Sequence, residues 1–260
     1  MSHSKNQLSL FVALASTLCT LATAPADETP SAPIRKLTNG DRVVFLGDSI
    51  TAGGIGKGRY ITLISDQAKA NNLEIECIGA GVSGNKVPNL QKRLDKDVLV
   101  HKPTVVVIFI GVNDVWHQDT GKGTSRQDYA AGLKDLITRI RAAKAEPILC
   151  TPGVIGEKIH WDPADMKPPP PPAAPKKKGK LLGIGQLASI LDEYSEISRR
   201  IAREQKVPLV DLHAAFLKYI ALNNRENKIN GILTKDNVHP NPTGSRLIAE
   251  QIGTALGIKF

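Results

Sequence analysis

The sequence predicts an α/β fold in which a five-stranded parallel sheet lies between two layers of helices. Apolar runs that need not alternate with polar residues, such as 105–110, are typical of strands buried on both faces. Segments with helical periodicity follow these runs along the chain, and such alternation gives a parallel sheet with right-handed crossovers. Polar residues follow several strand ends, at the edge where open α/β folds bind ligands.

The predicted strands are short and apolar. The first stops at Gly47, and the third is an unbroken run of β-branched and aromatic residues, which is the strongest strand pattern in the chain. In chain order the five predicted strands are 42–46, 73–78, 105–110, 147–150 and 208–212.

Helical periodicity occupies the intervals between the strands. In 60–70 the apolar residues Ile61, Ile64 and Ala68 recur at the spacing of one helix face, and 124–144 has the same pattern. The predicted helices are 60–70, 87–99, 124–144, 187–205, 214–223 and 243–256.

One segment, 161–185, breaks this alternation. It contains five consecutive prolines at 168–172 and four lysines between 176 and 180. Proline cannot donate to a strand ladder or continue a helix. We therefore expect an exposed, polyproline-like loop between the fourth strand and its helix. Its composition favours disorder, and a lid over the sheet edge is the alternative.

The amino-terminal residues have the order of a secretory signal. Lys5 precedes an uncharged apolar run at 8–21, and small residues follow at 22–26. We expect a signal peptide at 1–26, a polar linker at 27–40 and one domain at 41–260. The protein would then be secreted or periplasmic. The apolar run is short for a membrane span, so no stable membrane insertion is expected after cleavage.

Composition limits the partners and the redox chemistry. The 260 residues carry a formal charge of +9, without the basic stripe interleaved with aromatic residues that nucleic-acid binding needs. We expect no nucleic-acid partner. Beyond the signal, Cys77 and Cys150 end different apolar runs, and we expect two separate buried thiols, although export would permit a disulfide.

Polar groups suited to ester hydrolysis follow separate predicted strands or precede the last helix. Ser49 follows the first strand, Gly84 lies in a glycine-rich loop at 79–85 after the second, and Asn113 follows the third. Asp236 and His239 precede the last helix. A serine becomes a nucleophile when a histidine accepts its proton, and a carboxylate orients that histidine.

Sequence blocks around these residues resemble those of the SGNH hydrolases, also called GDSL-type esterases and lipases. Gly-Asp-Ser-Ile at 47–50 resembles the nucleophile block, with isoleucine in place of the usual leucine. Gly-Val-Ser-Gly-Asn at 81–85, Gly-Val-Asn-Asp at 111–114 and Asp-Asn-Val-His-Pro at 236–240 resemble the other blocks, in the same order. The resemblance covers nearly the whole mature chain and implies a flavodoxin-like three-layer α/β/α fold.

The resemblance also implies residue roles. Ser49 is expected to be the nucleophile, His239 its base and Asp236 the residue that orients the base. The backbone N–H groups of Ser49 and Gly84 and the side-chain amide of Asn113 are expected to form the oxyanion hole. No cofactor and no metal are implied. Asp48 adjoins the nucleophile but is expected to shape its loop.

Several polar residues of the chain also fit other roles. Asp211 and His213 offer a second acid and base, but alternate positions on an extended chain point to opposite faces. Asn113 fits a helix cap, and Asp114 with His117 lacks a third metal ligand at a familiar spacing. The loop at 51–58 resembles a phosphate-binding loop but lacks its first glycine and its final serine or threonine.

The sequence therefore predicts an exported serine esterase that acts on a small-molecule or glycan ester. Carbohydrate O-acetyl esters are the expected substrates. A lipase, lysophospholipase or thioesterase of the same family is one alternative, and an inactive binding module is another. Trp116, just beyond Asn113, is expected either to stack on the substrate or to anchor its loop.

Overall fold

A computed structural model describes residue 1 and residues 35–169 and 182–260, and the structural statements below concern these residues. Five parallel strands form one sheet in the order β2-β1-β3-β4-β5. The strands are β1 (Arg42–Gly47), β2 (Glu76–Gly81), β3 (Val105–Phe109), β4 (Glu146–Cys150) and β5 (Leu209–Val210). The expected fold class is confirmed.

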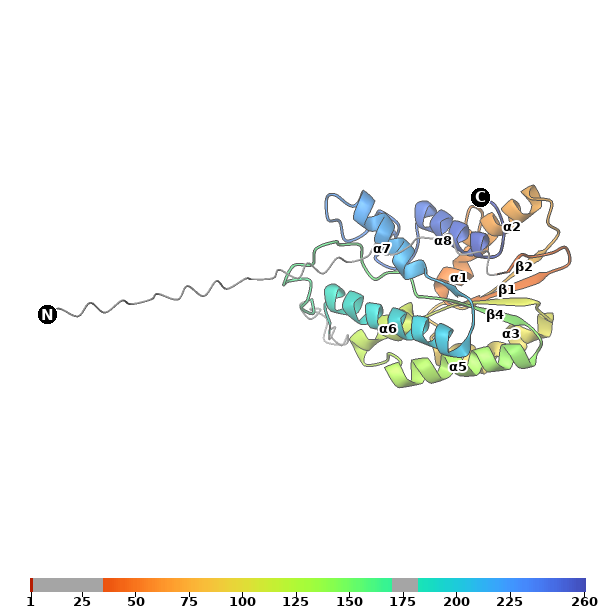
Figure 1. Cartoon of the computed structure of the whole chain (residues 1–260), viewed down its shortest axis with the longest axis horizontal. Coiled ribbons are helices and arrows are strands. Elements are labelled where there is room, and N and C mark those ends of the chain that lie inside the picture. Colours follow the sequence, from red (N-terminus) through yellow and green to blue (C-terminus); the bar gives the residue numbers. More distant parts are fainter. Residues whose placement is uncertain (2–34, 170–181) are drawn as a thin grey trace, which may run out of the picture. The chain divides into compact units, whose positions relative to one another are not determined.

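Helices cover both faces of this sheet. Figure 1 shows α1, α2, α7 and α8 on one face and α3, α5 and α6 on the other. Their bounds are α1 (Ser49–Gly54), α2 (Tyr60–Ala70), α3 (Val87–Asp97), α4 (Val112–Trp116), α5 (Arg126–Ala142), α6 (Ile184–Gln205), α7 (Leu212–Asn223) and α8 (Pro242–Ala255). Short 3₁₀ turns occupy Leu99–His101 and His117–Thr120.

The core lies between the central strands and these two helical layers. All five residues of β3 are buried, as is every residue of β1 after Arg42. On the α5 side, Tyr129, Leu133 and Ile140 pack inward from one helix face. The continuous apolar runs of the sequence therefore correspond to strands with no solvent-facing side.

The second strand begins later than its apolar pattern predicts. It runs over Glu76–Gly81 and includes glycines that we expected in a loop, while the residues after Ser49 form the short helix α1. A Cβ atom on Gly81 would lie 2.0 Å from the backbone nitrogen of Ala52, and one on Gly79 would lie 2.5 Å from Ile55. The glycines are thus strand residues that let α1 lie directly on β2.

Other boundaries also differ from expectation. Part of the predicted linker packs on the domain, because Leu37 is buried and Arg35 donates its backbone N–H to Ala255 at 3.2 Å. At the far end of the 161–185 segment, α6 already begins at Ile184. Residues 170–181 and nearly all of the predicted signal and linker lie outside the described residues, so the lid hypothesis stays a prediction.

Cys77 and Cys150 are both free thiols, as expected. Cys150 lies buried on β4, whereas Cys77 on β2 is partly exposed, contrary to the expectation that both are buried. Burial raises the pKa of the Cys77 thiol to about 12. Among the described residues, no helix is long and apolar enough to cross a membrane.

Replacing Gly81 with alanine should destabilise the fold, because the added methyl group would overlap the backbone of α1. Overpacking of this kind costs about 1–3 kcal/mol. Gly53→Ala is the matched control, since a Cβ there meets no atom within 4 Å. Urea denaturation should show a lower unfolding free energy for Gly81→Ala only. Equal stabilities of the two variants would contradict the close packing of α1 on β2.

Candidate active site

Ser49 lies where β1 ends and α1 begins. The side chain of Asp48 accepts the backbone N–H of Ile50 at 2.9 Å and thereby caps the new helix. Gly47 is required just before it, since a Cβ there would lie 2.2 Å from the hydroxyl of Thr51. This turn places Ser49, which is partly exposed, at the carboxyl edge of the sheet.

The hydroxyl of Ser49 contacts a histidine from the other end of the chain. Ser49 Oγ lies 2.9 Å from His239 Nε2, although the residues are 190 positions apart. On the opposite side of the ring, His239 Nδ1 lies 2.9 Å and 3.1 Å from the two carboxylate oxygens of Asp236. Since a carboxylate only accepts, Nδ1 carries the hydrogen and Nε2 is free to accept from the serine.

Asp236 and His239 share one tight turn between α7 and α8. Lys235 donates its N–H to His239 O at 2.9 Å, and Asp236 Oδ1 accepts the backbone N–H of His239 at 2.8 Å. Asn237 adopts a left-handed conformation with φ of 75°, which asparagine tolerates better than most residues. The acid and the histidine therefore form one local unit.

The same contacts determine the charge of Asp236. Burial would raise the pKa of this carboxyl, but the backbone N–H and the imidazole of His239, followed by the N–H of Val238, lower it below its ordinary value. Asp236 consequently stays ionised and able to hold the Nδ1 hydrogen of His239.

Asn113 lies buried at the start of α4, next to Asp48. Its Nδ2 atom donates to Asn85 O at 3.1 Å and lies 3.4 Å from Asp48 Oδ2. Both acceptors face the NH₂ end of the side-chain amide, so they fix which end of the amide is nitrogen and which is oxygen. Gly84 is exposed, with φ of 76° and no atom near its missing side chain, so its backbone is open to a ligand.

Asp48 and Asp114, which adjoin Ser49 and Asn113 in the chain, are both buried. Burial first, and then the neighbouring Asp114, raises the pKa of Asp48 to about 7, although the N–H of Ile50 opposes the shift. Burial likewise raises the pKa of Asp114 to about 6. Asp114 Oδ1 accepts the N–H of Val87 at 3.1 Å and so fixes the first residue of α3.

Sequence reasoning did not find Arg93, which connects several parts of the site. Its guanidinium donates to Gly47 O at 2.7 Å and to Asn85 Oδ1 at 2.7 Å. It therefore ties the end of β1 to the loop that carries Gly84. A single arginine on the helix 87–97 gives no sequence pattern that marks this contact.

The hollow beside Ser49 is small. It has a volume of about 100 Å³, and Ser49, His239, Arg59 and Tyr60 are among its lining residues. A larger cavity, about 610 Å³, lies elsewhere, between the loop after β4, α6 and α7. Neither Ser49 nor His239 lines that larger cavity, whereas both line the smaller hollow.

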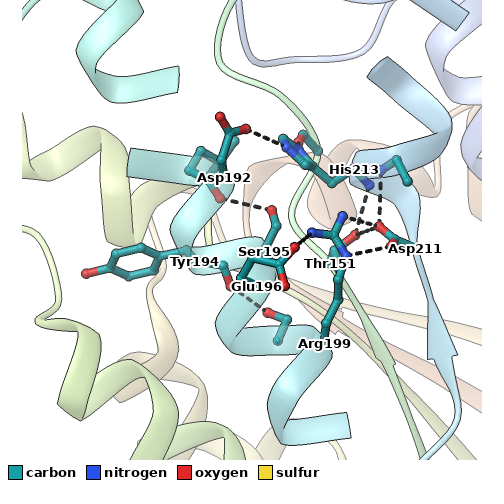
Figure 2. A network of polar contacts seen from close by, with 12 residues as sticks. Thr151, Asp192, Tyr194, Ser195, Glu196, Arg199, Asp211 and His213 are labelled. Carbon is teal, nitrogen blue, oxygen red and sulfur yellow. Dashed lines mark hydrogen bonds and ion pairs between the residues drawn. The ribbon is translucent and has the colours of Figure 1, made fainter. Parts of the chain in front are cut away.

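The alternative acid and base have separate partners. Figure 2 shows Asp211 bound by Arg199 and Thr151, whereas His213 contacts Asp192. Asp211 also caps α7, and His213 is buried with its Nδ1 2.6 Å from Gly153 O. The two side chains make no acid–base pair with each other.

Trp116 is the last residue of α4 and packs, partly buried, against the core. It is not among the residues that line the hollow at Ser49. Within the described ranges, no group of three or more histidine, cysteine, aspartate or glutamate residues is arranged to hold a metal ion.

Comparison with known proteins gives consistent matches. The profile of the GDSL-like lipase/acylhydrolase family matches residues 45–247. An acetylxylan esterase of Geobacillus stearothermophilus is 28% identical over 86% of this chain and 98% of its own length. The isoamyl acetate-hydrolyzing esterase 1 homolog of Rattus norvegicus is 25% identical over 80% of this chain and 78% of its length. The crystal structure of an acetyl xylan esterase, AlAXEase, is 37% identical over 83% of this chain and 99% of that one, with a TM-score of 0.71.

The pKa of Asp48 predicts an unusual pH dependence of stability. The folded value of about 7 lies above the ordinary 3.8, so between these values the unfolded chain is ionised while the folded protein keeps its proton. The contribution of Asp48 to the stability of the fold should therefore fall as pH rises from about 4 to 7 and then level off, by at most roughly 4 kcal/mol.

Asp48→Asn removes this titration and keeps an oxygen for the N–H of Ile50. Urea denaturation from pH 4 to 9 should show the variant gaining stability relative to the wild type up to about pH 7. A difference that does not change with pH would contradict the raised pKa of Asp48.

Proposed function

The chain belongs to the GDSL-like lipase/acylhydrolase family, and we propose that it is an exported serine esterase that removes acetyl groups from carbohydrates. The observation that carries this proposal is the hydrogen-bonded chain from Ser49 through His239 to Asp236. This chain supplies the nucleophile, base and orienting carboxylate that acyl transfer requires.

In the proposed reaction, Ser49 Oγ attacks the ester carbonyl carbon while His239 Nε2 accepts the hydroxyl proton. Asp236 accepts the Nδ1 hydrogen and stabilises the imidazolium that forms. The tetrahedral intermediate collapses, the alkoxide leaves with the proton from His239, and Ser49 stays acetylated. A water molecule then gives a proton to His239 and attacks the acetyl carbonyl carbon. The bond to Ser49 Oγ breaks, acetate is released, and His239 returns the proton to Ser49 Oγ, which restores the serine.

The negative oxygen of the intermediate needs hydrogen-bond donors. We assign this role to the backbone N–H groups of Ser49 and Gly84 and to Nδ2 of Asn113. The open backbone at Gly84 and the fixed amide of Asn113 support the assignment. Asn113 would donate to this oxygen the Nδ2 hydrogen that now faces Asp48. The contact with Asp48 is the longer of the two, at 3.4 Å against 3.1 Å for the contact with Asn85.

Two observations favour short acyl groups on a carbohydrate. The hollow of about 100 Å³ beside Ser49 and His239 suits an acetyl group better than a long chain. Relatives along most of this chain are named acetylxylan esterase, and another is named for the hydrolysis of isoamyl acetate. The amino-terminal pattern of Lys5, apolar run and small residues supports export.

Ser49→Ala should abolish hydrolysis of p-nitrophenyl acetate and of acetylated xylo-oligosaccharides, because no other group in the hollow is activated as a nucleophile. We expect a loss of kcat of at least about 10⁴-fold. Acetate release and the melting temperature should be measured together, and the variant should melt like the wild type. Retained turnover would contradict the assignment of the nucleophile.

The wild type should hydrolyse acetyl esters fastest in a panel of p-nitrophenyl esters of increasing chain length. The restricted hollow at Ser49 disfavours each added methylene group. The same panel should include acetylated xylan and acetylated monosaccharides. A preference for long acyl chains would instead indicate a lipase or thioesterase.

Trp116→Ala tests whether this indole stacks on the sugar. If it does, KM for acetylated xylo-oligosaccharides should rise about 2–10-fold, while the kinetics on p-nitrophenyl acetate stay unchanged. Unchanged kinetics on both substrates would leave Trp116 as a loop anchor only.

A further inference from the structure

Glu157 is a buried carboxylate that the proposed reaction does not use. It lies in the loop after β4, and only 1% of its surface is exposed. Its two oxygens accept three consecutive backbone N–H groups. Oε2 accepts from Ile232 at 2.7 Å, and Oε1 accepts from Leu233 at 2.7 Å and from Thr234 at 2.5 Å. Successive N–H groups directed at one anion form a cradle of the kind that binds negative charge.

The backbone beside Glu157 holds the same loop at further points. Glu157 N donates to Ile229 O at 2.9 Å, and Gly156 N donates to Asn237 O at 2.8 Å. Gly156 has φ of 74°, and a Cβ there would lie 2.6 Å from the ring of Trp161, so this segment has little freedom to shift. The loop 229–237 is thus attached along its length to residues 156–157.

The three N–H groups that Glu157 binds come directly before the turn that carries Asp236 and His239, and the Gly156 contact with Asn237 lies within that turn. Thr234, held by Glu157, also pairs with Pro240 across the base of the turn. Asp236 and His239 are bonded to each other within the turn, but the contact between His239 and Ser49 depends on where the whole turn lies. The position of Thr234, together with the Gly156 contact to Asn237, therefore contributes to the distance between His239 and Ser49.

We propose that Glu157 is a positioning residue for the reaction: by binding the N–H groups of 232–234 it places the Asp236–His239 turn so that His239 reaches Ser49. This inference rests on the proposed function of Ser49 and His239. It assigns Glu157 no contact with the substrate and no proton transfer.

A carboxylate is the side chain that this arrangement requires. All three partners donate, and a carboxylate only accepts. In Glu157→Gln one oxygen becomes an NH₂ group, so at least one backbone N–H faces another donor in a buried place. The amide must turn away or the loop must move, and a misplacement of about 1 Å can reduce the rate about 100-fold.

Glu157→Gln should therefore lower kcat for p-nitrophenyl acetate about 10–100-fold per folded molecule, with KM changed less than about threefold. The pH at which the rate falls on the acid side should stay in place, because Asp236 still contacts His239 within the displaced turn. Glu157→Asp keeps the carboxylate on a shorter side chain and should recover part of kcat. It is also the variant to measure if Glu157→Gln does not fold.

Asp41→Asn is the matched control. Asp41 is also a buried carboxylate, but it binds Arg35 and Thr38 at the amino end of β1, away from the site. The control should lower the melting temperature and leave kcat per folded molecule unchanged. If Glu157→Gln behaves like Asp41→Asn, with lower stability and an unchanged kcat, Glu157 is only structural and the proposal is overturned.

Two measurements decide the proposal independently of activity. Hydrogen exchange at the amides of 232–234 should be faster in Glu157→Gln, and a crystal structure of the variant should show Ser49 Oγ and His239 Nε2 beyond hydrogen-bond distance, about 3.5 Å. An unchanged Ser49–His239 distance would overturn the proposal. A wild type that is inactive on every ester would refute the proposed function, while these two measurements would still test the placement of His239 by Glu157.

Discussion

The hydrogen bond between Ser49 and His239 joins the first strand to the last loop, and the arrangement of the fold around the site follows from it. It requires the end of β1 and the turn before α8 to meet at one edge of the sheet. Parallel strands provide such an edge, because all of their carboxyl ends lie on the same side. The helical layers keep that edge rigid, since β1 and β3 are buried on both faces.

Buried carboxyl groups hold the segments that meet there. Asp48 binds the first turn of α1, Asp114 binds the start of α3, and Glu157 binds the loop before the Asp236–His239 turn. Each accepts backbone N–H groups that have no partner within their own segment. Burial makes ionisation of Asp48 and Asp114 unfavourable, and their raised pKa values reflect that cost. These two buried carboxyl groups therefore lower the stability of the folded protein at the positions where they hold the site in place.

The size of the hollow at Ser49 connects this geometry to the proposed substrate. Ser49 faces a space of about 100 Å³, while a cavity of about 610 Å³ lies between the loop after β4, α6 and α7. A large apolar cavity is a common guide to a binding site. Here the hydrogen-bonded side chains of Ser49, His239 and Asp236 are the better guide to the candidate site, because proton transfer requires the acid and the base within hydrogen-bond distance.

Periodicity and turn residues are local properties, and they were therefore enough to predict the alternation of strands and helices, the parallel sheet, and the polar residues at the strand ends. It misplaced β2, since the reason for Gly81 is the backbone of α1, which packs on it from another part of the chain. Arg93 and Glu157 carry no local pattern. The Gly47 partner of Arg93 lies 46 positions away, and the partners of Glu157 lie 75–77 positions away. Which N–H and C=O groups need a partner depends on where water is excluded, and that exclusion follows from the packing of distant segments. The side chains that hold the site together are therefore visible only in the folded chain.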